Sequence, residues 1–195
     1  MLVKIPRPSQ ALAIVIAMAG LWQFGAGVYV HIKARLAQQL ISTAWSRSLH
    51  GEHQVRPWPW ADAWPVARLQ VPAQNIDLYV LADASGRSLA FGPGLVSGSA
   101  APGTQGNSII AAHRDTHFRF LRDLPIGTLL TLQTTDGKFH RYILTEGQIL
   151  DVRRDYLDVN APGSTLTLLT CYPFDAIGQS GPLRYAAIAE QASSP

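Results

Sequence analysis

The chain has 195 residues, of which 47% are apolar and only 15% charged, and its formal net charge is +3. This length suits one domain with an appendage. The lysines and arginines are scattered, so we expect no nucleic-acid partner; a mildly basic balance suits a nearby anionic membrane instead. The single cysteine excludes an internal disulfide and a cysteine-rich metal site.

An uncharged apolar block, ALAIVIAMAGLWQFGAGVYV, occupies residues 11–30. As a helix rising about 1.5 Å per residue it would cross the hydrocarbon core of a lipid bilayer, which is about 30 Å thick. It exceeds the ~7–15 apolar residues of a cleaved signal peptide, so we favour an uncleaved anchor. Lys4 and Arg7 precede it and Lys33 and Arg35 follow it, so the positive-inside rule barely discriminates. The short tail and long body favour a single-pass protein with its body outside the cytoplasm.

A connecting region, residues 31–65, follows the apolar block. Apolar residues recur at near-helical spacing over 31–50, which predicts a stalk continuing the membrane helix or a helix packed on the body. RPWPWADAWP (56–65) contains three prolines and three tryptophans and predicts an extended connector. Packing is the simplest role for these tryptophans. We therefore divide the chain into 1–30, the tail and membrane helix, 31–65, the helical stalk and connector, and 66–195, a β domain.

Short strands and turns dominate the rest of the chain. Apolar or alternating runs predict strands at 66–71, 76–81, 108–113, 165–171 and 183–190, and residues 128–150 predict a hairpin that turns at Asp136-Gly137. The Gly-, Ser- and Pro-rich stretch 91–107 predicts a loop, and 118–124 predicts one or two helical turns. Some seven short strands with little helix predict an all-β barrel or sandwich.

Three chemically capable residues, His113, Cys171 and Arg184, lie at the margins of predicted strands. A thiol of ordinary pKa, ~8.5, is mostly protonated at neutral pH, and a neighbouring imidazolium or guanidinium favours the nucleophilic thiolate. Histidine can protonate a leaving amine and deprotonate an incoming one. Arginine, always protonated, can stabilise an oxyanion. These residue types are common, so a buried, inert cysteine is the competing interpretation.

The sequence around these residues resembles the sortase family. TLTLLTCYPF (165–174) resembles the Thr-Leu-x-Thr-Cys signature of sortases, and IIAAHRDTHFRFLRDLPIGT (109–128) resembles their histidine segment. GPLRYAAIAE (181–190) resembles the final sortase strand, with its arginine near the start. The order and spacing of the segments and the membrane anchor agree with this family. The resemblance covers roughly residues 66–190.

This resemblance implies an eight-stranded sortase-type β-barrel with short helices and a cysteine transpeptidase without a cofactor. Cys171 would be the nucleophile, His113 the general acid/base and Arg184 the substrate or oxyanion stabiliser. Thr170, inside the signature, would bind substrate. Sortases cleave a C-terminal sorting signal of the Leu-Pro-x-Thr-Gly kind at the Thr–Gly bond and form a thioester. They then pass the acyl group to an amine, which the sequence does not identify.

Other polar residues are interpreted more simply. His117 is expected to be an exposed turn residue. Some sortases bind calcium through acidic loops, but here Asp151, Asp155 and Asp158 alternate with arginines, as in a solvated loop, so we expect no required metal. The connector and this loop resemble the single-sortase systems of Gram-negative bacteria, which would place the body in the periplasm.

Two alternatives stay open at this stage. A membrane-anchored cysteine hydrolase would share the acyl-enzyme step, but water would take the acyl group. A non-enzymatic β-barrel binding module would keep Cys171 buried and inert. Under the sortase interpretation, residues that select the sorting signal should lie in the loops 91–107, 145–164 and 172–182, around the cysteine.

Overall fold

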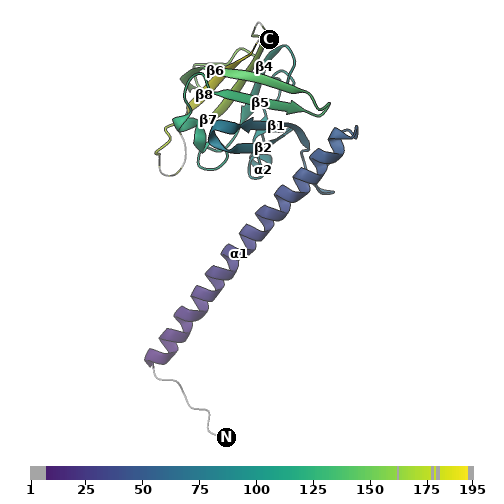
Figure 1. The fold of residues 1–195 in the computed structure, drawn as a ribbon. Coiled ribbons are helices and arrows are strands. Elements are labelled where there is room, and N and C mark those ends of the chain that lie inside the picture. The colour runs from purple at the N-terminus through teal and green to yellow at the C-terminus, as the bar shows by residue number, and fades with distance from the viewer. Residues whose placement is uncertain (1–7, 162, 177, 179–180, 193–195) are drawn as a thin grey trace. The chain divides into compact units, whose positions relative to one another are not determined.

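The computed structural model describes residues 8–161, 163–176, 178 and 181–192. The chain divides into two compact units, Met1–Gln39 and Leu40–Pro195. Helix α1, Pro8–Leu49, is unbroken: most of it forms the first unit, and its last turns belong to the second (Figure 1).

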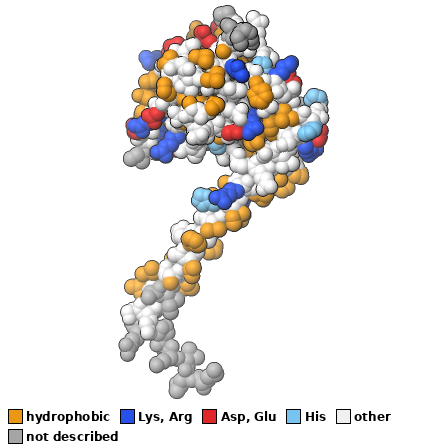
Figure 2. All heavy atoms as spheres, viewed as in Figure 1, with side chains coloured by type: hydrophobic (Ala, Val, Ile, Leu, Met, Phe, Trp, Pro, Cys, Tyr) orange, Lys and Arg blue, Asp and Glu red, His pale blue; other side chains and the backbone are white. Residues whose placement is uncertain are grey.

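The first unit presents an apolar surface. Large apolar side chains from Leu12 to Leu36 are exposed along α1 (Figure 2). The helical segment Val15–Leu49 is long and apolar enough to cross a membrane, and none of its most apolar window is buried. A signal sequence near an N-terminus has the same properties. The helix therefore suits a membrane-spanning segment by its length and composition.

The second unit is a closed barrel of short strands. The strands are β1 (Pro65–Val71), β2 (Ile76–Leu81), β3 (Gly94–Leu95), β4 (Gly106–Ala111), β5 (Leu129–Thr134), β6 (Phe139–Asp151), β7 (Ser164–Cys171) and β8 (Leu183–Gln191). Their order around the barrel is β1-β2-β3-β4-β7-β8-β6-β5, and β5 pairs with β1 to close it (Figure 1). Neighbours are antiparallel except β2·β3 and β4·β7. The predicted all-β barrel is confirmed.

Short helices connect some of these strands. They are η1 (Pro72–Gln74), α2 (Gly86–Leu89) and η2 (Arg119–Asp123). The helical turn predicted at 118–124 is η2. The stretch 91–107 was predicted to be a loop with little regular structure. It contains the two-residue strand β3, which pairs with both β2 and β4, and its last two residues begin β4.

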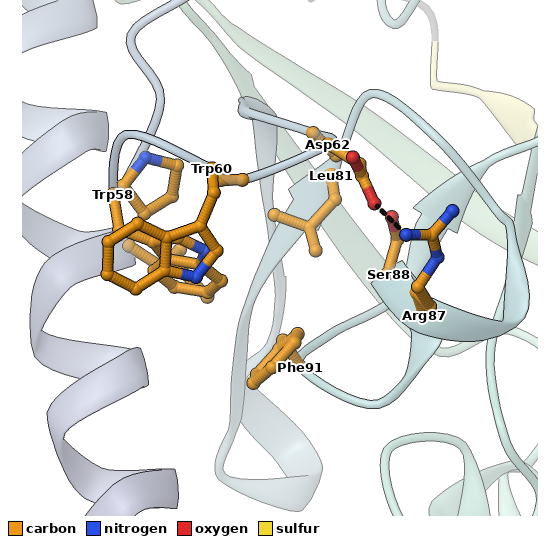
Figure 3. Close-up of a pocket in the computed structure, with 11 residues that line it drawn as sticks. Trp58, Trp60, Asp62, Leu81, Arg87, Ser88 and Phe91 are labelled. Atoms are coloured by element: carbon orange, nitrogen blue, oxygen red, sulfur yellow. Dashed lines mark ion pairs between the residues drawn. The ribbon is translucent and has the colours of Figure 1, made fainter.

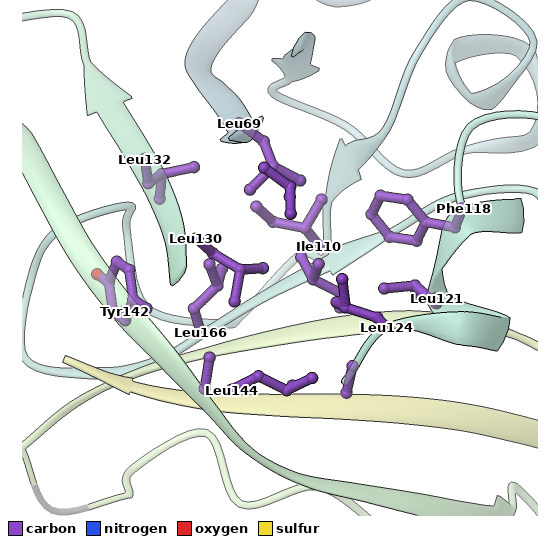
Figure 4. Close-up of a cluster of buried hydrophobic side chains, with 14 of the residues drawn as sticks. Leu69, Ile110, Phe118, Leu121, Leu124, Leu130, Leu132, Tyr142, Leu144 and Leu166 are labelled. Atoms are coloured by element: carbon purple, nitrogen blue, oxygen red, sulfur yellow. The ribbon is translucent and has the colours of Figure 1, made fainter. Parts of the chain in front are cut away.

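Alternating burial fills the barrel with side chains. Along β1 every second residue is buried, as expected for a strand with one face on a core. Leu130 and Leu132 of β5, Leu144 of β6 and Leu166 of β7 point into the interior (Figure 4). Each fully buried leucine stabilises the fold by about 1.5–3 kcal/mol. Three apolar residues near η2 extend this core: Phe118, Leu121 and Leu124.

The end of α1 and the connector pack on the barrel. Trp45 is buried against the ring of Tyr79 in β2, with the ring centroids 6.2 Å apart, and the Tyr79 hydroxyl donates to Ser42 Oγ at 3.1 Å. Residues 31–49 therefore continue the apolar part of α1 without a break, and their C-terminal end packs on the barrel. The segment has features of both predicted alternatives, a stalk and a helix packed on the body. In the connector, Trp58 contacts Phe91 edge-to-face, whereas Trp60 is 80% exposed.

Trp58, Phe91 and Leu81 line a small cavity of about 60 Å³, beside which Arg87 pairs with Asp62 at 3.1 Å (Figure 3). The connector tryptophans therefore divide between packing and solvent. The cavity has room for a side chain at most, and the connector residues around it chiefly attach the end of α1 to the barrel.

Candidate active site

The pairing of β7 with β8 sets two of the predicted site residues opposite each other. Cys171 is the last residue of β7 and Arg184 the second residue of β8, and they are partners in the antiparallel ladder. Just beyond Cys171, the amide of Tyr172 donates to the carbonyl of Leu183 at 3.0 Å. The candidate nucleophile and the candidate arginine therefore lie on adjacent strands at one end of the barrel, with Cys171 half-buried.

The parallel pairing of β4 with β7 brings the histidine segment to the same end. Ala111 is the partner of Leu169, and the Ala112 amide donates to the Leu169 carbonyl at 3.1 Å. The Thr170 hydroxyl donates to the Ala112 carbonyl at 2.8 Å. His113 follows directly and is exposed. It was predicted to end a strand, but β4 ends at Ala111, two residues earlier.

Thr170 and Arg184 both bond to backbone carbonyls. The Thr170 side chain is buried, and the bond to Ala112 occupies its hydroxyl. The Arg184 guanidinium donates from Nη1 to the carbonyls of Gly181 and Leu183, both at 2.8 Å. It is therefore held where the β7–β8 loop enters β8. The predicted contact of Thr170 with substrate stays a prediction.

His117 lies in a more buried position than predicted. It is half-buried, and its Nδ1 lies 3.2 Å from the Thr116 hydroxyl. Burial lowers the pKa of His117, and the positive charge of nearby His113 lowers it further. His117 therefore favours its neutral form at neutral pH, next to the candidate acid/base.

Sequence reasoning missed one residue of this region, Arg114. Its side chain is 3% exposed and donates to the carbonyls of Pro173 and Ala176, in the loop after Cys171. It also pairs with Asp115. The sequence feature that could have indicated Arg114 is the polar triplet His-Arg-Asp after an apolar run. Such a triplet by itself is typical of a solvated turn.

The sequence of this chain is similar to those of known proteins. A sortase domain model matches residues 69–192, more than half of the chain. The chain belongs to the sortase family. Sortase D of Bacillus subtilis (strain 168) is 30% identical over 118 residues, which are 60% of this sortase and 59% of that protein. This sortase thus spans less than two thirds of that relative's length.

Solved structures share the fold. A Clostridium perfringens Sortase D5 transpeptidase superposes with a TM-score of 0.59 at 22% identity, over 67% of this sortase and 80% of that chain. Sortase A from Corynebacterium diphtheriae superposes with a TM-score of 0.61 at 19% identity, over 82% and 85%. The predicted sortase-type eight-stranded barrel is confirmed. The proposed likeness to Gram-negative systems stays a prediction.

The acidic loop of this sortase is held by internal hydrogen bonds. Asp151 is buried and accepts a hydrogen bond from Arg153 Nε at 2.9 Å, and this guanidinium holds the pKa of Asp151 well below its usual range. The Asp155 carboxylate accepts from the Asp151 amide, and that of Asp158 accepts from the Asn160 amide. Among the described residues, no group of three or more His, Cys, Asp or Glu side chains could hold a metal ion.

The strand register places the three loops that were expected to surround the cysteine. The loop 172–182 connects Cys171 directly to β8. The loop after β6 begins at the same end, because Asp151 is the partner of Leu183, but it reaches the opposite end by Gly163, whose carbonyl accepts from Gly106. The stretch 91–107 likewise starts near Ala111, the partner of Gly94, and ends at the far end. Only the first parts of these two loops lie at the cysteine end.

Proposed function

We propose that this sortase is a membrane-anchored cysteine transpeptidase that cleaves a C-terminal sorting signal of the Leu-Pro-x-Thr-Gly kind. The observation that carries the proposal is the β7–β8 register, which sets Cys171 opposite Arg184 at the strand end to which the His113 segment is tied. Family membership supports the reaction class. Residues 11–30 would anchor it in the lipid bilayer, with the barrel on the extracytoplasmic side.

In the first step the Cys171 thiolate attacks the carbonyl carbon of the signal's threonine. A tetrahedral oxyanion forms, and the Arg184 guanidinium is proposed to stabilise it by charge-assisted hydrogen bonds. The carbon–nitrogen bond to glycine then breaks. His113, as imidazolium, gives its proton to the leaving amine, and the acyl group stays on sulfur as a thioester.

In the second step an amine attacks the thioester. Neutral His113 takes a proton from this amine, a second oxyanion forms beside Arg184, and the carbon–sulfur bond breaks. A new amide leaves, and the sulfur returns as thiolate beside a protonated histidine. Protons and electrons therefore balance over the cycle without a cofactor, because one peptide bond is exchanged for another.

The test uses the full chain in detergent with peptides that carry candidate sorting signals. Mass spectrometry should detect a thioester adduct on Cys171, and adding a glycine peptide should give a new amide product. C171A should lose the adduct while the barrel stays folded, since the substitution removes little volume at a strand end. R184K should lose most turnover, because the planar donor fork is gone although the charge remains.

Other outcomes would contradict the proposal in distinct ways. Adduct formation that yields only acid in the presence of amine would indicate the hydrolase alternative. Slow alkylation of Cys171 that is indifferent to H113A would indicate the binding module. Near-normal turnover in R184K would remove Arg184 from its assigned role.

A further inference from the structure

Arg114 occupies an unusual position for a charged side chain. It follows His113 directly, yet its side chain is 3% exposed. Its Nη1 donates to the Pro173 carbonyl at 2.7 Å, and its Nη2 donates to the Ala176 carbonyl at 2.9 Å. Both carbonyls belong to the loop that begins after Cys171. A charge is tolerated at such depth only where its donors find partners, and these two contacts join the histidine segment to the cysteine loop.

The opposite edge of the same guanidinium is fixed by an acid. Nε donates to Asp115 Oδ1 at 2.7 Å, and Nη2 donates to Asp115 Oδ2 at 3.0 Å. These bonds are the main reason that the pKa of Arg114 is raised. The side chain is therefore always charged and has a fixed orientation beside the loop that follows the cysteine.

We propose that Arg114 is a positioning residue that fixes the distance between the imidazole of His113 and the sulfur of Cys171. The inference rests on the proposed function. The guanidinium is rigid and planar, and it donates hydrogen bonds to the loop after Cys171. The backbone of Arg114 is joined directly to His113, so the position of this side chain constrains the position of the histidine. Together with the bond from Thr170 to Ala112, it attaches the residues on both sides of His113 to the cysteine strand and its loop through buried side chains.

A second arginine offers a matched control. Arg122 pairs with Asp175 of the same loop, with Nη1–Oδ1 at 2.6 Å and Nη2–Oδ2 at 3.2 Å. Both of these side chains are well exposed, at 49% and 75%. Exposed ion pairs of this kind contribute little. Arg122 therefore touches the same loop with the same chemical group, but without burial and without adjacency to His113.

The test is a double-mutant cycle on the alkylation rate of the full chain in detergent. Because Cys171 is the only cysteine, iodoacetamide labelling followed by mass spectrometry reports on it alone. In the wild-type background, H113A should slow labelling by about tenfold or more, because the charged histidine favours the thiolate. In the R114Q background, H113A should slow labelling by less than about twofold, because the imidazole of His113 is then no longer held near the sulfur of Cys171. In R122Q, H113A should act as in wild type.

The outcomes separate this inference from the proposed function. If H113A has no effect in wild type, the histidine–cysteine pairing itself fails. If H113A has the same effect in R114Q as in wild type, only the role of Arg114 is overturned, because a merely structural arginine gives additive effects. Thermal unfolding by circular dichroism checks that R114Q is folded. If it is not, R114K, which keeps the charge but loses the planar fork, replaces it in the same cycle.

Discussion

Replacing Thr170 by valine should test how the histidine segment is attached to the cysteine strand. Valine has nearly the same shape but cannot donate the 2.8 Å hydrogen bond to the Ala112 carbonyl. Thr170 is 2% exposed and Ala112 is 5% exposed, so water cannot readily replace the lost donor. An unsatisfied buried acceptor costs about 1–3 kcal/mol. At about 2–4 °C per kcal/mol, a loss of about 2 kcal/mol lowers Tm by about 4–8 °C.

Thr167 supplies a matched control on the same strand. It is fully buried, and its hydroxyl donates to Asn107 Oδ1 at 2.9 Å, nearer the other end of β4. T167V should therefore lose a similar free energy of unfolding. Only T170V should also slow alkylation and acyl transfer at Cys171, by about tenfold or more, because small displacements of reacting groups are costly.

Urea unfolding, iodoacetamide labelling and peptide turnover of both variants decide the question. Equal loss of labelling in T170V and T167V would show general loosening of β7 and refute the reasoning. A raised KM for the sorting peptide with unchanged labelling in T170V would instead assign Thr170 to substrate binding.

Two further predictions concern stability. Because the pKa of His117 is lowered in the folded barrel, the unfolded chain binds more protons below about pH 6.5, so the free energy of unfolding should fall between about pH 7.5 and 5.5. Urea titrations at both pH values should show a smaller decrease in the free energy of unfolding for H117Q than for the wild type. An equal decrease would contradict the assignment of this pH dependence to His117. Leu168 in β7 is fully buried, so L168A should lose about 2–5 kcal/mol. L129A, at a position 39% exposed, should lose much less, and similar losses would be evidence against the described core.

Features encoded by neighbouring residues could be predicted from the sequence. The β5–β6 hairpin is an example: Gly137 has a φ of +81°, which glycine adopts without strain, and its amide donates to the Thr134 carbonyl. The alternating runs on either side then pair because their apolar faces meet a common core. The cysteine signature at the end of β7 was also readable, because it is a continuous segment.

Features made by distant contacts could not be predicted in the same way. β3 has two residues and exists because β2 and β4 flank it. Arg114 stands in a polar stretch typical of a solvated turn, and its burial depends on carbonyls 59 and 62 residues further along. Cys171 and Arg184 are 13 positions apart in the sequence, and that separation alone does not fix the register of β7 on β8 that sets them opposite each other.

The parallel contact of β4 with β7 also constrains when the molecule can work. These strands are separated by more than fifty residues, and β4 has only a two-residue neighbour on its other side. β4, and the histidine two residues beyond its end, therefore gain a full-length neighbour only when β7 pairs with them, and the closure of so long a loop is slow. The candidate site can therefore form only after the last two strands, β7 and β8, have been made and paired, so its assembly is a late step in the folding of the barrel.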